Sequence, residues 1–322
     1  MEKVRWGVLG TAGIARTMTI PAMQQAENCS LYAIAGRNPQ KAREFQQAFG
    51  FEKAYEGFDA LLADPKVEAV YVPLPNDLHH DCVIRALNAG KHVLCEKPLA
   101  LNEQQAEEMF RAAESNGVFL MEAFAYLHSP LIAAVKRELE SGVIGEIRYF
   151  ASAFLGGLPR VNNYRWVKSA GGGAAYDLGC YPVSLALWLL GREPDEIRAA
   201  AQFSDQGIDM FTSMMFMYGH GLIANLDCGM LSGTPRLDRL HLLGTHGEIY
   251  SPVQFNQCGE IPYTVVSDGQ AETKVISVPN NYRLEVEQLG RCVRGEAKPL
   301  ISREFSLIAA RTMDRVLREI GY

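Results

Sequence analysis

Short apolar runs alternate with longer amphipathic segments over residues 1–121. The short runs predict strands at residues 4–9, 31–35, 69–72, 92–95 and 119–121. Apolar positions at helical spacing predict helices at residues 39–49, 77–89 and 102–116, with Asn102 as an N-cap and Gly90 and Gly117 as C-cap glycines. This alternation is typical of an α/β fold, a doubly wound parallel sheet with helices on both faces.

The pattern changes after about residue 125. Helical spacing predicts helices at 131–139 and 177–190 around a strand at 147–154, and residues 197–278 are predicted to form successive strands separated by turns. Two helices, at 282–294 and 302–320, complete the chain. Strands joined by turns favour a large, mostly antiparallel open sheet, so we expect an α+β domain over residues 123–322 after a first domain over residues 1–122.

Charge and cysteine content narrow the classes of partner. The chain has 322 residues and a net charge of -6, without a block of like charges, so we expect neither nucleic acid nor a membrane surface as a partner. Seven dispersed cysteines form no metal-ligand pattern, which indicates a reducing, cytoplasmic setting without a structural metal. We also expect no signal peptide and no membrane span, because no apolar stretch reaches the ~18 residues that a span needs.

A glycine-containing turn, Gly10-Thr11-Ala12-Gly13-Ile14-Ala15, connects the first predicted strand to a helix. Such a turn brings backbone N–H groups and a helix N-terminus to a pyrophosphate. Ala12 replaces the second glycine of the dinucleotide pattern, and Ala15 satisfies the third position. We therefore predict that residues 10–14 bind a dinucleotide in a Rossmann domain; the alternative is an ordinary strand-to-helix turn.

The residues after the second predicted strand are basic. Arg37 follows this strand, Lys41 and Arg43 come soon after, and no acidic residue is present there. Cations at this position bind a 2′-phosphate, whereas an acid binds the 2′-hydroxyl of NAD. The sequence favours NADP over NAD, with a merely solvated Arg37 as the alternative.

Two further segments carry candidate chemistry. Glu96-Lys97-Pro98 follows a predicted strand, so Lys97 projects at the ligand-binding end of the sheet unless it is a solvated turn residue. The segment 171–181 has three consecutive glycines and then Asp177 and Tyr181, four residues apart and expected on one helix face. The alternative for this segment is a packing helix capped by Asp177.

Together, these segments resemble the glucose-fructose oxidoreductase and inositol dehydrogenase (Gfo/Idh/MocA) family, in order over nearly the whole chain. Tyr181, where many members have histidine, and the segment 119–124 are similar to the branch of NADP-dependent xylose dehydrogenases and dimeric dihydrodiol dehydrogenases. Ala125 and Leu127 stand where that branch often carries a larger residue and an arginine, so the resemblance leaves the sugar, polyol or diol open.

The resemblance implies hydride transfer between C4 of the nicotinamide and a carbinol carbon, with Tyr181 passing the proton. A lysine ammonium ~4 Å from a tyrosine stabilises the tyrosinate by ~4 kcal/mol at a dielectric of ~20. This would lower the tyrosine pKa from ~10 by about three. Lys97 would supply that charge. Asp177 would bind a substrate hydroxyl or orient Lys97.

Other site residues are expected from their places in the sequence. Along the cofactor we expect Pro73, Leu74, Asn76, His79 and Glu96, with Arg165 and Trp166 near the nicotinamide. For the substrate we expect Tyr164, Arg148 and Phe154, the last two with ordinary packing as the alternative. His79 and His80 lack further metal-ligand residues at a suitable spacing, so we expect no metal.

Two other functions compete with a dehydrogenase. One is a sugar sensor or regulator that binds a dinucleotide without catalysis, which retention of Lys97 and Tyr181 disfavours. The other is a glycosidase-type enzyme that uses bound NAD transiently. An open antiparallel sheet needs cover on both faces, so we expect a homodimer, or a homotetramer, through the C-terminal sheet.

Overall fold

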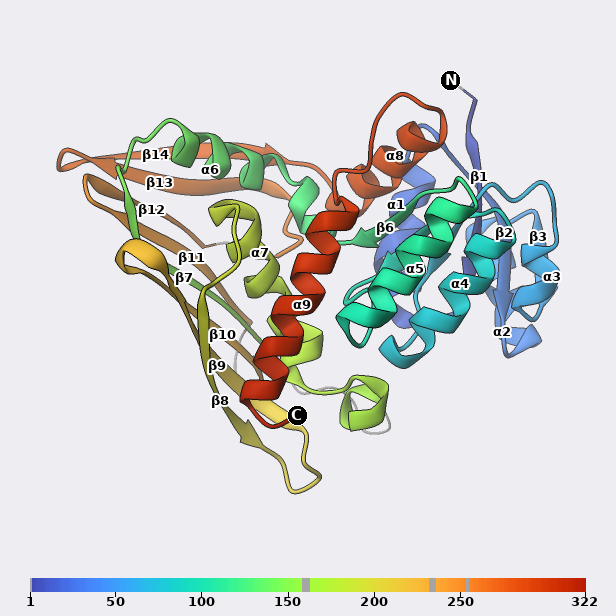
Figure 1. Cartoon of the computed structure of the whole chain (residues 1–322). Coiled ribbons are helices and arrows are strands. Elements are labelled where there is room, and N and C mark those ends of the chain that lie inside the picture. The colour runs from blue at the N-terminus through green and yellow to red at the C-terminus, as the bar shows by residue number, and fades with distance from the viewer. Residues whose placement is uncertain (1, 158–162, 232–235, 253–254) are drawn as a thin grey trace. The chain divides into compact units, whose positions relative to one another are not determined.

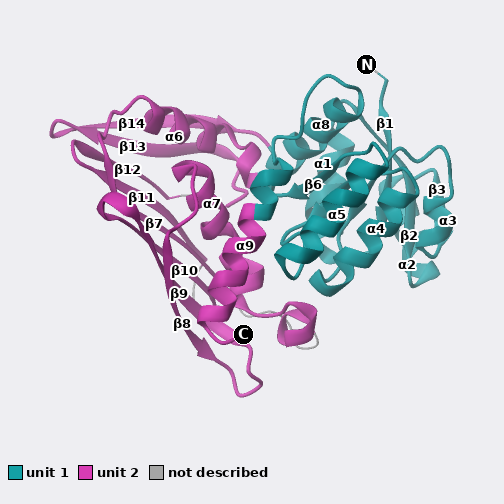
Figure 2. Ribbon diagram, viewed as in Figure 1, with its two compact units in different colours: residues 1–125, 280–307 teal, residues 126–279, 308–322 magenta. Residues whose placement is uncertain are grey.

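The structure, a computed structural model, describes residues 2–157, 163–231, 236–252 and 255–322. Figure 2 shows two compact units: unit 1 is Met1–Ala125 with Asn280–Leu307, and unit 2 is Tyr126–Pro279 with Ile308–Tyr322. The domain division at residues 122 and 123 stays a prediction; the units differ from it mainly because residues 280–307 pack with the N-terminal part of the chain.

Unit 1 is built on six parallel strands in the order β3-β2-β1-β4-β5-β6 (Figure 1). The strands are β1 Val4–Leu9, β2 Cys29–Gly36, β3 Lys53–Glu56, β4 Ala69–Val72, β5 His92–Glu96 and β6 Leu120–Ala123. The chain reverses its direction of travel across the sheet between β1 and β4. Open parallel sheets bind ligands outside the carboxyl ends of the strands at such a point.

Helices cover both faces of this sheet, as predicted. Short α1 and α8 pack against each other on one side, while α4 and α5 pack against each other on the other (Figure 1). Asn102 caps α5 by accepting a hydrogen bond from the Gln105 amide at 2.9 Å. The helices are α1 Ile20–Gln25 after a π-helical segment at Ala15–Thr19, α2 Pro39–Phe49, α3 Phe58–Leu62, α4 His79–Asn88, α5 Glu103–Ser115 and α8 Asn281–Val293.

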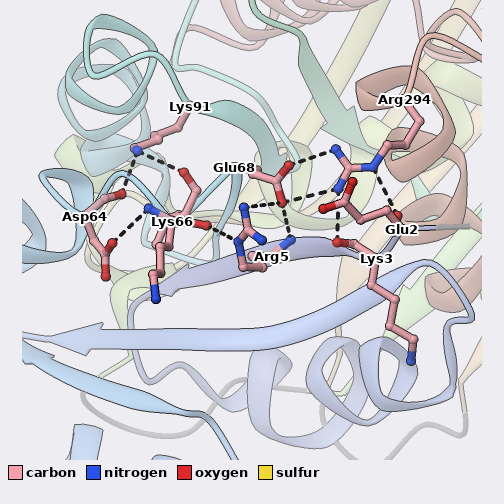
Figure 3. A network of polar contacts seen from close by, with 9 residues as sticks. Glu2, Lys3, Arg5, Asp64, Lys66, Glu68, Lys91 and Arg294 are labelled. Atoms are coloured by element: carbon pink, nitrogen blue, oxygen red, sulfur yellow. Dashed lines mark hydrogen bonds and ion pairs between the residues drawn. The ribbon is translucent and has the colours of Figure 1, made fainter.

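A polar network at the amino ends of the strands joins α8 to the sheet (Figure 3). Arg294, just after α8, pairs with Glu68 at 2.8 Å and donates to the carbonyls of Glu2 and Lys3. The Glu68 carboxylate also accepts the Arg5 amide at 2.9 Å, and the two arginines lower its pKa against the opposing effect of burial. These bonds explain why residues 280–307 belong to unit 1.

Unit 2 contains an eight-stranded sheet in the order β14-β13-β12-β11-β7-β10-β9-β8. All neighbouring strands are antiparallel except β7 and β10, which are parallel. This confirms the predicted α/β plus α+β fold class. The strands are β7 Ile147–Gly156, β8 Glu196–Phe203, β9 Asp209–Tyr218, β10 Leu222–Met230, β11 Leu237–Gly244, β12 Gly247–Ser251, β13 Gly259–Ser267 and β14 Gln270–Val278.

Three helices accompany this sheet. Figure 1 shows α6 (Pro130–Glu140) beside β14 and α7 (Cys180–Leu190) beside β7 and β10. The last helix, α9 (Arg303–Glu319), contributes its first five residues to unit 1 and the remainder to unit 2. No helix formed by the described residues is long and apolar enough to cross a membrane.

Candidate active site

A cavity of about 450 Å³ lies at the carboxyl ends of β1, β2 and β4. The turn that follows β1 is joined to β2 because the Gly10 amide donates to the Ala35 carbonyl at 2.8 Å. Seven of the residues predicted to bind the cofactor line this one cavity: Gly10, Thr11, Ala12, Arg37, Lys41, Pro73 and Leu74. Residues from three separate turns of the sequence therefore meet at the switch point of the sheet.

The glycines of this turn leave space for a ligand. Gly10 has a φ of +133°, which side chains rarely tolerate, and a Cβ there would lie 3.1 Å from Leu74. Gly13 is exposed, and a Cβ built on it would meet nothing within 4 Å. Ile14 turns inward to pack against the buried cluster of Ala22, Ala125 and Tyr282. The loop thus presents its backbone outward and is anchored by Ile14.

The charge at the cavity suits a phosphate. Asn38 caps α2 by accepting the Lys41 amide at 3.1 Å, which fixes the turn that carries the two cations. Arg37 and Lys41 are both exposed at the cavity wall. The donor set therefore fits a dinucleotide with an additional phosphate on its adenosine ribose.

His79 connects the turn after β4 to the turn after β5. It is fully buried, with Nε2 2.8 Å from the Leu74 carbonyl and Nδ1 3.0 Å from the Pro98 carbonyl. Burial lowers its pKa, so the neutral ring donates to one of these carbonyls. Asn76, also buried, lies in the same turn. His79 acts as a brace between two ligand-facing turns, and no cluster able to hold a metal occurs among the described residues.

The turn that carries Lys97 is held on both sides. Tyr71 donates to the Glu96 carboxylate at 2.6 Å, and Thr19 donates to the Tyr71 hydroxyl at 2.9 Å. Beyond the cis peptide between Lys97 and Pro98, the Leu99 amide donates to Glu122 at 2.9 Å. Lys97 itself is half-buried in unit 1, and the backbone around it is fixed.

Tyr181 belongs to unit 2, in the first turn of α7. Its ring packs against those of Phe154, Phe255 and Tyr126, with centroid distances of 5.0, 5.1 and 5.6 Å. The Tyr126 hydroxyl donates to the Tyr181 carbonyl at 3.2 Å and lies 2.7 Å from the Ser184 hydroxyl. The predicted residues Phe154 and Tyr181 therefore meet in an aromatic cluster that holds the start of the helix.

The segment before Tyr181 differs from the helix expected there. Residues Ala175–Gly179 form a π-helical turn, and α7 begins only at Cys180. A buried aspartate of β9, Asp209, accepts the Ala175 amide at 2.7 Å and the Thr212 hydroxyl at 2.9 Å. Burial raises the pKa of Asp209 to about 6. This carboxyl anchors the glycine segment against the sheet.

Asp177 forms a hydrogen bond with Arg165, a residue that was predicted to bind the cofactor. The Arg165 Nε atom donates to the Asp177 carboxylate at 2.5 Å. Burial acts to lower the pKa of Arg165, but the charge and the hydrogen bond of Asp177, together with nearby tyrosines, outweigh this effect and raise that pKa. Arg165 also lies over the Tyr164 ring, 4.7 Å from its centroid, and the neighbouring Trp166 has a buried Nε1 without a hydrogen-bond partner among the described residues. Residues 164–166 and Asp177 form one cluster.

Arg148 lies apart from these residues. It is near the start of β7, where it donates to the His220 carbonyl and to Glu146, whereas Phe154 is near the end of the same strand. The structure does not bring Arg148 to the aromatic cluster.

Four residues of these clusters were missed in the sequence: Glu122, Tyr126, Asp209 and Phe255. Glu122 and Asp209 are acidic residues within apolar strands, which is a signal for a buried carboxyl with a specific partner. The partners themselves, backbone amides 23 and 34 residues away in the chain, have no such signal.

Comparison with known proteins agrees with this architecture. Residues 4–124 match the model of an oxidoreductase family with an NAD-binding Rossmann fold, and residues 132–250 match the GFO/IDH/MocA C-terminal domain. A D-xylose 1-dehydrogenase (NADP(+)) of Haloferax volcanii is 35% identical over 97% of this chain and 95% of its own length. A trans-1,2-dihydrobenzene-1,2-diol dehydrogenase of Xenopus laevis is 30% identical over 98% of each chain.

A solved structure shows the same fold over both units. The 3-ketoreductase of Actinomadura kijaniata, in complex with NADP and TDP-benzene, is 32% identical and covers 99% of this chain and 98% of its own, with a TM-score of 0.93. These likenesses confirm the resemblance seen in the sequence. The chain belongs to the Gfo/Idh/MocA family of oxidoreductases.

Proposed function

We propose that this protein transfers a hydride between NADP(H) and a carbinol or carbonyl carbon of a sugar or a related polyol or diol. The observation that carries the proposal is the cavity at the switch point of the parallel sheet, with its glycine turn and the cations Arg37 and Lys41. Two relatives support this cofactor and a sugar-like substrate: the xylose dehydrogenase is named as NADP-dependent, and the 3-ketoreductase was solved in complex with NADP.

The residues of unit 1 would hold NADP. The glycine turn offers backbone N–H groups to the pyrophosphate, and Arg37 and Lys41 offer their cations to the 2′-phosphate. Pro73 and Leu74 form an apolar wall, while His79 and Asn76 stiffen the turn behind it. The bound nicotinamide supplies the site that donates or accepts a hydride.

Tyr181, assisted by Lys97, would transfer the proton to or from the substrate oxygen. We propose that in reduction the Tyr181 hydroxyl gives its proton to the carbonyl oxygen, and that in oxidation the Tyr181 phenolate takes the proton of the carbinol. The Lys97 ammonium would stabilise the phenolate form. This requires both groups to reach the same substrate oxygen. Asp177, held by Arg165, would bind a substrate hydroxyl or orient Lys97.

The aromatic rings of unit 2 support a sugar or diol as the substrate. Phe154 and Phe255 stack at an angle of 19° with their centroids 5.2 Å apart, next to Tyr181. Flat rings beside a hydroxyl suit a ligand with both C–H and O–H surface. We include Tyr164 in this binding region because it lies with Arg165 near Asp177. No contact supports Arg148 as a substrate residue.

We further propose that the open face of the unit 2 sheet pairs with a second copy of the chain. Apolar side chains on five strands are exposed on this face: Met215, Ile223, Leu237, Tyr250 and Val275. A two-fold pair would cover them on both copies, which favours a homodimer over a homotetramer. The seven cysteines are free thiols, six of them buried, which supports a reducing compartment such as the cytoplasm.

A screen with aldoses, inositols and trans-diols tests the function. In each reaction the absorbance of the reduced nicotinamide measures how fast NADP+ or NAD+ is reduced. We expect net reduction of NADP+ with at least one of these substrates, and a lower rate of reduction with NAD+. Tight NADP binding without turnover, in this direction or with the matching ketones and NADPH, would contradict a dehydrogenase and indicate a sensor.

A further inference from the structure

The backbone that follows Lys97 is tied to the neighbouring strand by Glu122. Glu122 lies on β6 and is 3% exposed. Its Oε1 accepts the Leu99 amide at 2.9 Å, while the Pro98 carbonyl on the preceding residue faces His79 at 3.0 Å. Two buried side chains therefore hold the single peptide group between Pro98 and Leu99, Glu122 through its N–H and His79 through its C=O.

Burial of Glu122 is costly, which argues that its bond is specific. Its second carboxylate oxygen, Oε2, is buried without a hydrogen bond of normal geometry among the described residues. Desolvation raises the pKa of Glu122 to about 7; Ser306, the Leu99 amide and the Lys97 charge work against the rise, and Glu96 adds to it. A methionine or leucine of similar size would fill the space without this cost.

The Glu122 carboxyl and Lys97 are also coupled by charge. The ammonium of Lys97 lowers the pKa of Glu122. Since this interaction is mutual, the ionised carboxyl stabilises the ammonium in return. The buried side chain thus acts on Lys97 in two ways, through the Leu99 amide and through charge.

We propose that Glu122 is a positioning residue for Lys97, fixing the turn that carries this lysine through the Leu99 amide. The inference rests on the proposed function, because Lys97 must take part in the reaction for its position to matter. A misplacement of about 1 Å in a catalytic group costs on the order of 100-fold in rate. Glu122 would prevent such movement at the turn.

Two substitutions of Glu122 separate the effect of its hydrogen bond to Leu99 from the effects of its charge and its volume. Glu122→Gln keeps an oxygen acceptor for the Leu99 amide, whereas Glu122→Met keeps the approximate volume and removes the acceptor. We expect Glu122→Gln to retain kcat within about threefold and Glu122→Met to lower kcat by about tenfold or more, with KM for NADPH unchanged. Equal kcat values for the two variants would overturn the proposal.

The rate at which an amine reagent labels Lys97, followed by mass spectrometry, gives a readout besides turnover. We expect Glu122→Met to change this rate and its pH dependence more than Glu122→Gln does. Identical labelling in both variants and the unmodified protein would contradict a positioning role.

Controls distinguish this inference from loss of stability and from failure of the proposed function. Asp64→Asn removes another buried carboxyl of unit 1, which binds Lys53, Tyr55 and the Lys66 amide, and it should lower stability while leaving kcat unchanged. Lys97→Met tests the mechanism itself: if it retains full turnover, the proposed role of Lys97 fails. If Lys97→Met is inactive and Glu122→Met has normal kcat, only the inference about Glu122 fails.

Discussion

At the residue scale, the candidate site depends on a few charged side chains whose surroundings differ sharply. Arg37 and Lys41 are exposed at a cavity wall, where a charge costs little and a phosphate can reach it. Glu122, Asp209 and Asp177 are buried, so each needs the partner that the structure shows for it. A local pattern in the sequence predicts Arg37, which the structure places at the cavity wall, whereas Glu122 and Asp209 were missed because their partners are distant in the chain.

Replacement of Arg37 tests the phosphate preference. We expect Arg37→Ser to weaken NADPH binding by about tenfold or more, because a charge-assisted bond worth roughly 1.5–3 kcal/mol is lost, and to leave NADH binding nearly unchanged. Fluorescence titration with both cofactors measures this. The assignment would be wrong if the unmodified protein bound NADH tenfold more tightly than NADPH.

The raised pKa of Glu122 predicts how stability changes with pH. Because the folded protein favours the protonated carboxyl, the free energy of unfolding should fall as pH rises from 4.5, the ordinary value, to about 7. Glu122→Gln lacks this titration, so its stability relative to the unmodified protein should increase across that window, by roughly 3 kcal/mol at most. Denaturant unfolding at pH 5 and pH 8 measures the difference; a constant difference would refute the prediction.

At the element scale, strands and helices with clear periodicity were predicted within a few residues. The strand β3 was missed because Lys53 and Glu56, at its two ends, are exposed and its short sequence has no apolar run. The helix predicted at 177–190 includes the end of the π-helical turn Ala175–Gly179, and this turn was not predicted because it depends on a tertiary contact with Asp209. Periodicity finds elements that bury a face and does not find those shaped by a single distant partner.

The glycine segment before Tyr181 gives a prediction at this scale. Gly173 has a φ of +106°, and a Cβ there would overlap a carboxylate oxygen of Asp209. We expect Gly173→Ala to lower kcat/KM for the substrate by at least about tenfold, because the turn that carries Asp177 must move, while NADPH binding in unit 1 persists. Gly207→Ala, at another positive-φ glycine with open space around it, is the matched control and should have little effect on kcat/KM.

At the scale of the whole molecule, the chain forms two units, and each unit combines two separate stretches of the sequence. Residues 280–307 were assigned to the second domain because they follow its strands directly. The bonds from Arg294 to Glu68 and to the first residues of the chain place them with unit 1 instead. Such a return of the chain has no local signal, since it is set by contacts across more than 200 residues.

The exposed face of the unit 2 sheet gives a prediction about assembly. We expect light scattering to give twice the mass of one chain, and Ile223→Asp, on strand β10, to shift the population toward single chains. Asp205→Asn, in the turn between β8 and β9, changes a charge off the strands and should leave the mass unchanged. A single-chain mass for the unmodified protein would contradict the proposed pairing.

The central claim is that Tyr181 passes the proton while unit 1 binds NADP(H). Its most direct test is Tyr181→Phe, with turnover and NADPH affinity measured on the same preparation and the best substrate of the screen. We expect kcat to fall by at least about 100-fold while the Kd for NADPH stays within about twofold of that of the unmodified protein. Near-normal kcat in Tyr181→Phe would contradict it.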